Sequence, residues 1–156
     1  MTTLQIGHAL PAFKAETSQG TFDSHALLGK PWVLYFYPKD NTPGCTLEAQ
    51  GFRDHHAEFQ ALGCGIYGVS RDSLKSHDGF IEKQCLPFAL ISDPDETLCE
   101  LFGVMKLKNM YGKQVRGIER STFLVDAKGR LAQEWRGVKV PDHVAAVLKA
   151  VQELAA

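Results

Sequence analysis

Residues 35–50 hold the side chains with the clearest potential for chemistry. An apolar, aromatic run over residues 32–37 ends at Pro38, and a short loop of turn-forming residues then leads to Cys45. The segment after Cys45 has helical spacing, so the sequence predicts a strand, a loop and a helix N-terminus that receives one thiol. Unpaired N–H groups and the positive end of the helix dipole gather at such a place. We therefore expect the sulfur to lose its proton readily and to act as a nucleophile.

A lone cysteine is more often a small buried apolar residue, and this alternative applies to Cys45. The setting favours chemistry, because loops that follow a buried strand are where α/β proteins place reactive groups. Pro43 and Gly44 hold the chain in a turn and let other groups approach the backbone. Thr42 lies three residues before Cys45, so its hydroxyl is expected to reach the sulfur or the substrate. A threonine at this place can also simply stabilise a turn.

The same residues resemble the active-site signature of the peroxiredoxins, Pro38-x-x-x-Thr42-x-x-Cys45. The longer stretch 36–48 (FYPKDNTPGCTLE) is similar to the bacterioferritin-comigratory protein branch, also called PrxQ. The resemblance continues in the expected order over nearly the whole chain, in GVSRDS (68–73), ISDPD (91–95), MYGK (110–113) and GIERSTFL (117–124).

The resemblance implies a thiol-dependent peroxidase that reduces hydrogen peroxide and organic hydroperoxides, with Cys45 becoming a sulfenic acid. It implies that Arg120, which sequence spacing does not connect to Cys45, stabilises the thiolate and the charge on the breaking O–O bond. It also implies that Pro38 shields the thiolate, and that Glu48 on the same helical face as Cys45 orients Arg120. Pro38 can equally end a strand, and Arg120 can equally form a surface ion pair with Glu119.

The sulfenic acid has to be reduced, and here the sequence departs from the two patterns of this branch. The position five residues after Cys45 is Gln50, and the other position that the resemblance implies for a second cysteine is Ile81. Cys85 follows Ile81 by about one helical turn and is the candidate partner for a disulfide with Cys45. Such a disulfide is expected to need local unfolding around Cys45, because the bond tolerates only a narrow range of Cα separations.

Two other recycling routes stay open. Glutathione or another external thiol could resolve the oxidised Cys45 directly, in a mechanism with one cysteine. Cys64 or Cys99 could contribute instead, although both have the surroundings of packed core cysteines. The resemblance implies thioredoxin or a similar thiol donor as the reductant.

Length and charge limit the other function classes. The 156 residues predict one domain over residues 1–156, and a formal net charge of −1 with scattered Lys and Arg argues against nucleic acid as a partner. No apolar run approaches the roughly 20 residues of a membrane span. The N-terminus lacks the pattern of a signal peptide, so we expect a cytoplasmic protein that is a monomer or weak dimer. No Cys-x-x-Cys pair occurs, and we expect no cofactor and no metal.

The expected elements alternate between strands and helices, which predicts a layered α/β domain with helices on both faces of a mixed sheet. The resemblance implies the more specific thioredoxin-like fold. Phe13 and Phe22 are expected to anchor an N-terminal hairpin, and Leu47, Phe52 and Phe59 to face the core from the first helix. Strands are expected at 32–37, 65–70, 87–91, 118–125 and 131–135, helices at 46–62, 73–84, 93–102 and 140–154, and an irregular segment at 105–117.

A non-enzymatic redox sensor or adaptor on the same fold is the competing hypothesis. A metal-delivering adaptor is expected to have two cysteines close together, and this sequence has none. A sensor would carry the same reactive Cys45 but would stall after one equivalent of peroxide.

Overall fold

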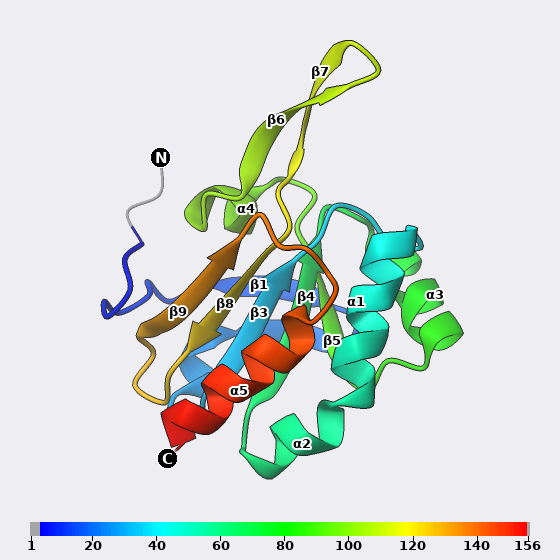
Figure 1. The fold of residues 1–156 in the computed structure, drawn as a ribbon. Helices are drawn as coiled ribbons and strands as arrows, with labels where there is room; N and C mark the ends of the chain where they lie inside the picture. Colours follow the sequence, from blue (N-terminus) through cyan, green and yellow to red (C-terminus); the bar gives the residue numbers. More distant parts are fainter. Residues whose placement is uncertain (1–3, 156) are drawn as a thin grey trace.

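The structure, a computed structural model, describes residues 4–155. In this range seven strands form one mixed sheet, in the order β2-β1-β5-β4-β3-β8-β9 (Figure 1). The three central strands β3, β4 and β5 run parallel, whereas β1, β2, β8 and β9 join by antiparallel pairing. The strands of this sheet are β1 (Lys14–Thr17), β2 (Gly20–Asp23), β3 (Trp32–Phe36), β4 (Gly65–Ser70), β5 (Ala89–Ser92), β8 (Ser121–Val125) and β9 (Leu131–Arg136).

Helices cover both faces of the sheet, as the sequence predicted. Helices α1, α2, α3 and α5 pack on one face, and α4 packs on the other with the N-terminal segment (Figure 1). No helix within residues 4–155 is long and apolar enough to cross a membrane. The helices are η1 (Ser24–Leu27), α1 (Pro43–Asp54), α2 (His56–Ala61), α3 (Leu74–Gln84), α4 (Thr97–Leu101) and α5 (His143–Ala155).

Strand β3 is the centre of the fold because all five of its residues are buried. Side chains alternate between the faces of a strand. Val33 and Tyr35 therefore join the core under α1 and α5, whereas Leu34 and Phe36 join the core under α4. A continuous apolar run is typical of a strand that is covered on both sides, and this expectation is confirmed.

The first long helix differs from the expected range 46–62. It begins earlier, at Pro43, because proline is preorganised for the first helical position. It ends at Asp54, because the backbone of His55 leaves helical geometry with ψ of 4°. The ring Nδ1 of His55 lies 2.9 Å from the carbonyl oxygen of Gly51. The prediction that Leu47 is buried is also wrong, because its side chain is 60% exposed.

Helices α3 and α5 and the N-terminal hairpin lie close to their predicted ranges. Ser73 caps α3, and its hydroxyl oxygen accepts the N–H of Ser76 at 3.1 Å. Phe22 is buried and stacks on Phe13 with 5.4 Å between ring centroids, as anticipated for the hairpin. Helix α4 is shorter than expected, and the carboxylate of Asp93 accepts two of its N–H groups.

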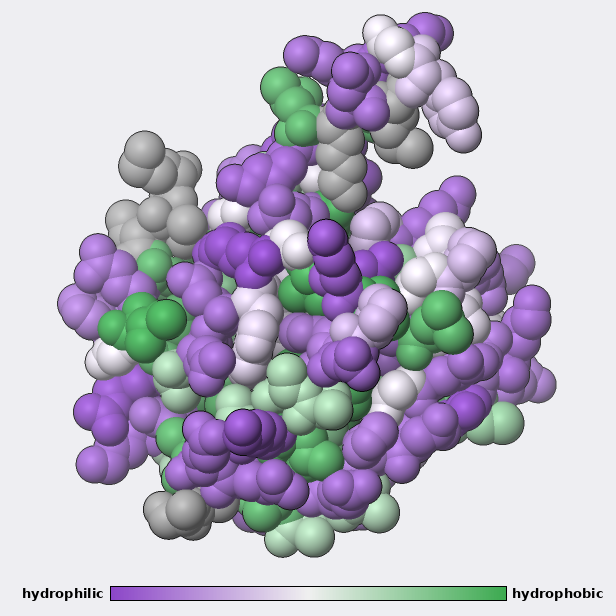
Figure 2. Space-filling view, in the orientation of Figure 1, coloured by the Kyte–Doolittle hydropathy of each residue, from purple (hydrophilic) through white to green (hydrophobic). Residues whose placement is uncertain are grey.

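Residues 105–117, expected to be irregular, form most of a second sheet. Strands β6 (Met105–Met110) and β7 (Lys113–Ile118) pair as an antiparallel hairpin that stands out from the body (Figures 1 and 2). Its turn residues Tyr111 and Gly112 both have positive φ, which suits a tight hairpin turn. Residues 105–108 alternate between apolar and polar, but the alternation does not continue through the rest of the hairpin, much of which is exposed to solvent.

We predict that Gly68→Ala destabilises the fold. A Cβ at this position of β4 would lie 2.7 Å from Leu90 Cδ2 and 2.8 Å from Tyr35 Cζ, both in the core. The overpacking is expected to lower the free energy of unfolding by about 1–3 kcal/mol in urea denaturation. The control is Gly79→Ala on the exposed side of α3, where no atom lies within 4 Å. Equal stability of the two variants would contradict the prediction.

Candidate active site

Cys45 lies in the first turn of α1, where the loop after β3 delivers it. Pro43 opens the helix, and the N–H of Thr46 donates to the carbonyl oxygen of Thr42 at 2.9 Å to close the first turn. The Cys45 residue is only 1% exposed and packs with the core residues under α1. The prediction of a thiol at a helix N-terminus is therefore confirmed, with the sulfur sheltered from solvent.

Arg120 reaches this thiol because of the pairing between β3 and β8. Ser121, the first residue of β8, pairs with Phe36, the last residue of β3. The sequence predicted that Arg120 lies on a strand over residues 118–125, and this prediction is wrong. Arg120 lies in the two-residue link between β7 and β8. Its Nη2 lies 3.4 Å from the Sγ of Cys45.

Gly44 leaves room for this approach. A Cβ at Gly44 would lie 3.0 Å from Nη2 of Arg120, which is tighter than ordinary van der Waals contact. The absence of a side chain before Cys45 therefore lets the guanidinium sit against the start of the helix.

Glu48 is the second partner of the guanidinium. Nη1 of Arg120 donates to Oε1 of Glu48 at 2.7 Å, so Arg120 does not form the alternative surface pair with Glu119. Glu48 is fully buried, and its Oε2 has no hydrogen-bond partner. Burial raises the pKa of Glu48 to about 7, although the charge and hydrogen bonds of Arg120 act in the opposite direction.

The charge of Arg120 is retained in this setting. Burial lowers its pKa, but its interactions with Glu48 and Cys45 outweigh that effect, and the pKa of Arg120 is raised above its ordinary value. A permanent cation with fixed partners on both sides is suited to stabilising negative charge on sulfur or on a peroxide oxygen.

Thr42 and Pro38 lie in the loop that leads to Cys45. Thr42 occupies the N-cap position of α1, but its hydroxyl donates to the carbonyl oxygen of Lys39 at 2.8 Å. This contact supports the turn, which was the alternative role for Thr42. Pro38 is half-buried and follows β3 after Tyr37.

The other three cysteines differ sharply in their surroundings. Cys64 and Cys99 are buried, as expected for core cysteines. Burial raises the pKa of Cys64 to about 12, and burial together with Asp93 raises that of Cys99 further. Cys85 is exposed and ends α3 in the left-handed region, with φ of 55°. Cys85 thus lies at the end of the helix, the position where a glycine is common.

Cys85 is not next to Cys45 in this structure. The residue before it, Gln84, is hydrogen-bonded through its side chain to Gln50 and through its carbonyl oxygen to Arg53. Gln50 and Arg53 follow Cys45 by five and eight residues, which is about 7–12 Å along a helix axis. Cys85 therefore lies beside the later turns of α1.

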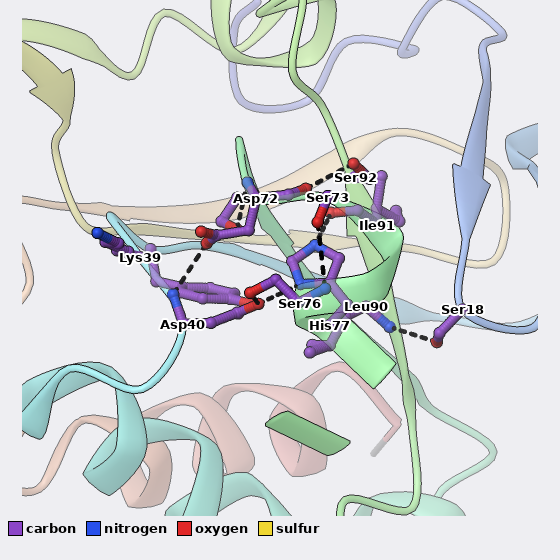
Figure 3. A network of polar contacts seen from close by, with 12 residues as sticks. Ser18, Lys39, Asp40, Asp72, Ser73, Ser76, His77, Leu90, Ile91 and Ser92 are labelled. Atoms are coloured by element: carbon purple, nitrogen blue, oxygen red, sulfur yellow. Dashed lines mark hydrogen bonds and ion pairs between the residues drawn. The ribbon is translucent and has the colours of Figure 1, made fainter. Parts of the chain in front are cut away.

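Sequence reasoning missed a buried polar network behind the loop. Asp40, two residues before Thr42, contacts the ring of His77 from α3, and both residues are buried (Figure 3). Asp40 lies inside the recognised motif, but only the fold brings His77 to it. Among the described residues, no group of three or more His, Cys, Asp or Glu side chains could hold a metal ion.

We predict that Glu48 makes stability depend on pH. Its folded pKa of about 7 exceeds the ordinary 4.5, so the folded state binds this proton more tightly. Relative to Glu48→Gln, which keeps an acceptor for Arg120, the wild-type free energy of unfolding should fall as pH rises from 4.5 to 7. The change should be on the order of 1–3 kcal/mol in urea denaturation.

Glu58→Gln, on an exposed position of α2, is the control for the loss of a carboxylate. A difference between wild type and Glu48→Gln that stays constant from pH 4.5 to 7 would show that Glu48 ionises normally in the folded protein.

Comparisons with known proteins agree with this geometry. Residues 6–134 match the AhpC/TSA family. Peroxiredoxin Bcp of Xanthomonas campestris is 54% identical over 143 residues, which cover 92% of this chain and 88% of that protein. Peroxiredoxin Bcp of Bacillus subtilis is 50% identical over 153 residues, covering 97% of this chain and 98% of that protein.

Solved structures give the same result. A structure of Xanthomonas campestris bacterioferritin comigratory protein, described for its alkyl peroxide reduction activity, has a TM-score of 0.90 and 48% identity, with complete coverage of both chains. A PrxQ mutant of Xylella fastidiosa has a TM-score of 0.94 and 40% identity, again with complete coverage of both. The fold is thus the thioredoxin-like fold of these proteins. The chain belongs to the AhpC/TSA family and, within it, to the Bcp or PrxQ peroxiredoxins, which are thiol-dependent peroxidases.

Proposed function

We propose that Cys45 is the nucleophile that reduces the peroxide. The observation that carries this proposal is the position of Arg120, whose Nη2 lies 3.4 Å from Sγ of Cys45 while Nη1 is held by Glu48. A guanidinium at this distance stabilises negative charge on the sulfur, and the thiolate is the reactive form of cysteine.

The reaction conserves atoms and electrons as follows. The Cys45 sulfur attacks one peroxide oxygen, an S–O bond forms, and the O–O bond breaks. The leaving oxygen takes the electron pair of that bond and a proton, giving water or an alcohol. The sulfur loses two electrons and becomes a sulfenic acid, the first reversible stage of cysteine oxidation.

Arg120 acts on the charge that spreads over the breaking O–O bond, and Glu48 holds the guanidinium in place. Preorganised charge of this kind in a water-poor site is among the largest contributions to enzymatic rate. In this proposal Pro38 shields the thiolate side of the pocket. Thr42, whose hydroxyl oxygen still has a free lone pair beside the helix start, turns toward the peroxide when it binds.

The substrates in this proposal are hydrogen peroxide and organic hydroperoxides. The alkyl peroxide reduction activity described for the Xanthomonas campestris relative supports the second class. The same activity favours an enzyme over the sensor or adaptor.

For recycling, we propose that Cys85 forms a disulfide with the oxidised Cys45. Of the four thiols, Cys64 and Cys99 are buried with raised pKa values, whereas Cys85 is exposed. The Cys85 sulfur attacks the sulfenic sulfur, and the oxygen leaves as water. Because Cys85 lies beside later turns of α1, the first turn of α1 has to unwind before the sulfurs can meet. An external thiol that resolves Cys45 alone is the alternative.

A dithiol donor such as thioredoxin then returns the disulfide to two thiols. We propose that this cycle runs in the cytoplasm, where thiols are kept reduced, and that the protein works as a monomer or weak dimer, without nucleic acid or membrane partners.

We predict that Cys45→Ser abolishes peroxide turnover, because serine cannot form a sulfenic acid. Arg120→Met should lower the second-order rate constant for peroxide by about 100-fold, since the charge beside sulfur and O–O bond is lost. Both are measured by stopped-flow peroxide consumption with excess thiol donor. Arg130→Met, on an exposed arginine paired with Asp126, is the control. Activity retained by Cys45→Ser would disprove the proposal.

We predict that one equivalent of peroxide links Cys45 to Cys85, seen by intact mass and peptide mapping. In Cys85→Ser the same treatment should leave a sulfenic acid on Cys45, which a dione probe captures. Wild-type protein that carries only an oxidised Cys45, with no disulfide, would show instead that an external thiol completes the cycle.

A further inference from the structure

His77 is fully buried in α3, and each of its ring nitrogens faces an oxygen (Figure 3). Nε2 lies 2.9 Å from the carbonyl oxygen of Ile91, and Nδ1 lies 2.7 Å from Oδ2 of Asp40. A carbonyl oxygen can only accept a hydrogen bond, so Nε2 must carry a proton. The charge of the ring then depends on whether Nδ1 or Asp40 holds the other proton.

The carboxylate of Asp40 collects donors in a buried place. The hydroxyl of Tyr37 donates to Oδ1 at 2.5 Å, and the hydroxyl of Ser76 donates to Oδ2 at 2.8 Å. Burial, the neighbouring Tyr35 and Asp40 raise the pKa of Tyr37 well above its ordinary value, so Tyr37 stays a donor. Hydrogen bonds to the charged form of a carboxyl favour that form, and a carboxylate can only accept.

We infer that His77 is a buried imidazolium paired with the Asp40 carboxylate, and that this ion pair is a positioning device for the loop that carries Cys45. With Asp40 ionised, Nδ1 of His77 has to donate, so both ring nitrogens carry protons. The consequence for the reaction rests on the proposed role of Cys45, whereas the charge state does not.

The surrounding ionisable groups are consistent with this pair. Tyr37 approaches Asp40 from the end of β3, and Tyr35 is near enough for the charge of Asp40 to act on it. Asp72, in the loop after β4, accepts the main-chain N–H of Asp40 at 2.8 Å and the hydroxyl of Ser70 at 2.6 Å. Within this network His77 contacts the carboxylate of Asp40 and the carbonyl oxygen of Ile91, whereas Asp72 contacts the main chain of Asp40.

The pair ties the active-site loop to two distant elements. Asp40 is held through its side chain by α3 and through its N–H by Asp72, and the next residue, Asn41, takes the left-handed conformation with φ of 63°. Thr42 then caps α1, and Cys45 follows within the first turn. Through Nε2, His77 also ties α3 to β5. The place of Cys45 relative to Arg120 therefore depends on a contact made outside the site.

The Asp40–His77 pair holds only the N-terminal end of α3, and the C-terminal end with Cys85 is outside its reach. Cys85 follows His77 by eight residues, which is about 12 Å along the helix. The N-terminal half of α3 is fixed by Ser76 and His77, whereas Cys85 is exposed at the other end. The Asp40–His77 pair keeps the loop before Cys45 in place against the start of α3 while the first turn of α1 opens.

The charge state is tested directly by nitrogen NMR of the reduced full-length protein labelled at histidine. At pH 7.5 the two ring nitrogens of His77 are expected to show protonated, imidazolium-type shifts and slowly exchanging ring protons. His25, which is exposed, is the internal control, and its ring protons should exchange rapidly with solvent. A neutral ring with one bare nitrogen at His77 would overturn the inference, whatever the activity of the protein.

The positioning role is tested with Asp40→Asn, His77→Gln and the double variant, each checked by circular dichroism to be folded. Each single change leaves a buried charge without its partner, whereas the double change removes both. The rate of Cys45 oxidation by peroxide should fall at least about tenfold in each single variant and recover most of the way in the double variant.

His25→Gln is the matched control and should react at the wild-type rate. Single effects that simply multiply in the double variant, or single variants with unchanged rates, would overturn the positioning role. A failed proposal for Cys45 is distinguishable, because Cys45→Ser would then retain turnover while the NMR result at His77 would stand.

Discussion

One partly buried guanidinium organises the candidate active site. Arg120 lies between the sulfur of Cys45 and the carboxylate of Glu48, and neither partner has access to bulk water. Taking charges out of water is costly unless they are paired, so the three groups are stable only together. Glu48 keeps its second oxygen unpartnered, which is why burial has such a large effect on its pKa. The protein thus maintains a cation beside the thiol at the cost of burying a carboxylate with one unpartnered oxygen.

The sheet brings these groups together from parts of the chain that are far apart in sequence. Residues Phe36 and Ser121 pair across β3 and β8, so the residue just before β8 arrives beside the residue that leads into the Cys45 loop. A shift of one residue in this register would turn the side chains of β8 to the other face of the sheet. The register is fixed because both strands are buried along their whole length. Core packing therefore sets the geometry of the chemistry.

The local sequence was sufficient to predict the position of the Cys45 thiol, but it was insufficient to predict which residues surround that thiol. The apolar run, Pro43 and the helical spacing after it predicted Cys45 at a helix start, because these signals act within a few residues. Contact between Arg120 and Cys45 depends on strand pairing, and only family resemblance suggested it. His77 was missed for the same reason. The predictions for the hairpin at 105–117 and for Leu47 were wrong. The pattern of apolar residues predicts structure only where those residues are buried, and both of these places face solvent.

In the proposed cycle, the Cys45 sulfur has to be sheltered when it attacks the peroxide and accessible when the sulfenic acid is resolved. Two different segments of the structure meet these two requirements. The loop before Cys45 is held by a network of buried hydrogen bonds around Asp40, which open rarely in native proteins. The first turn of α1 is closed by the bond between Thr46 and Thr42, and the side chain of Thr42 gives it no cap. A helix N-terminus without a side-chain cap is less stable than a capped one, typically by about 1 kcal/mol. In the proposed cycle, unwinding therefore begins at Pro43 and leaves the loop undisturbed, so that the thiol moves while the Asp40–His77 pair stays in place.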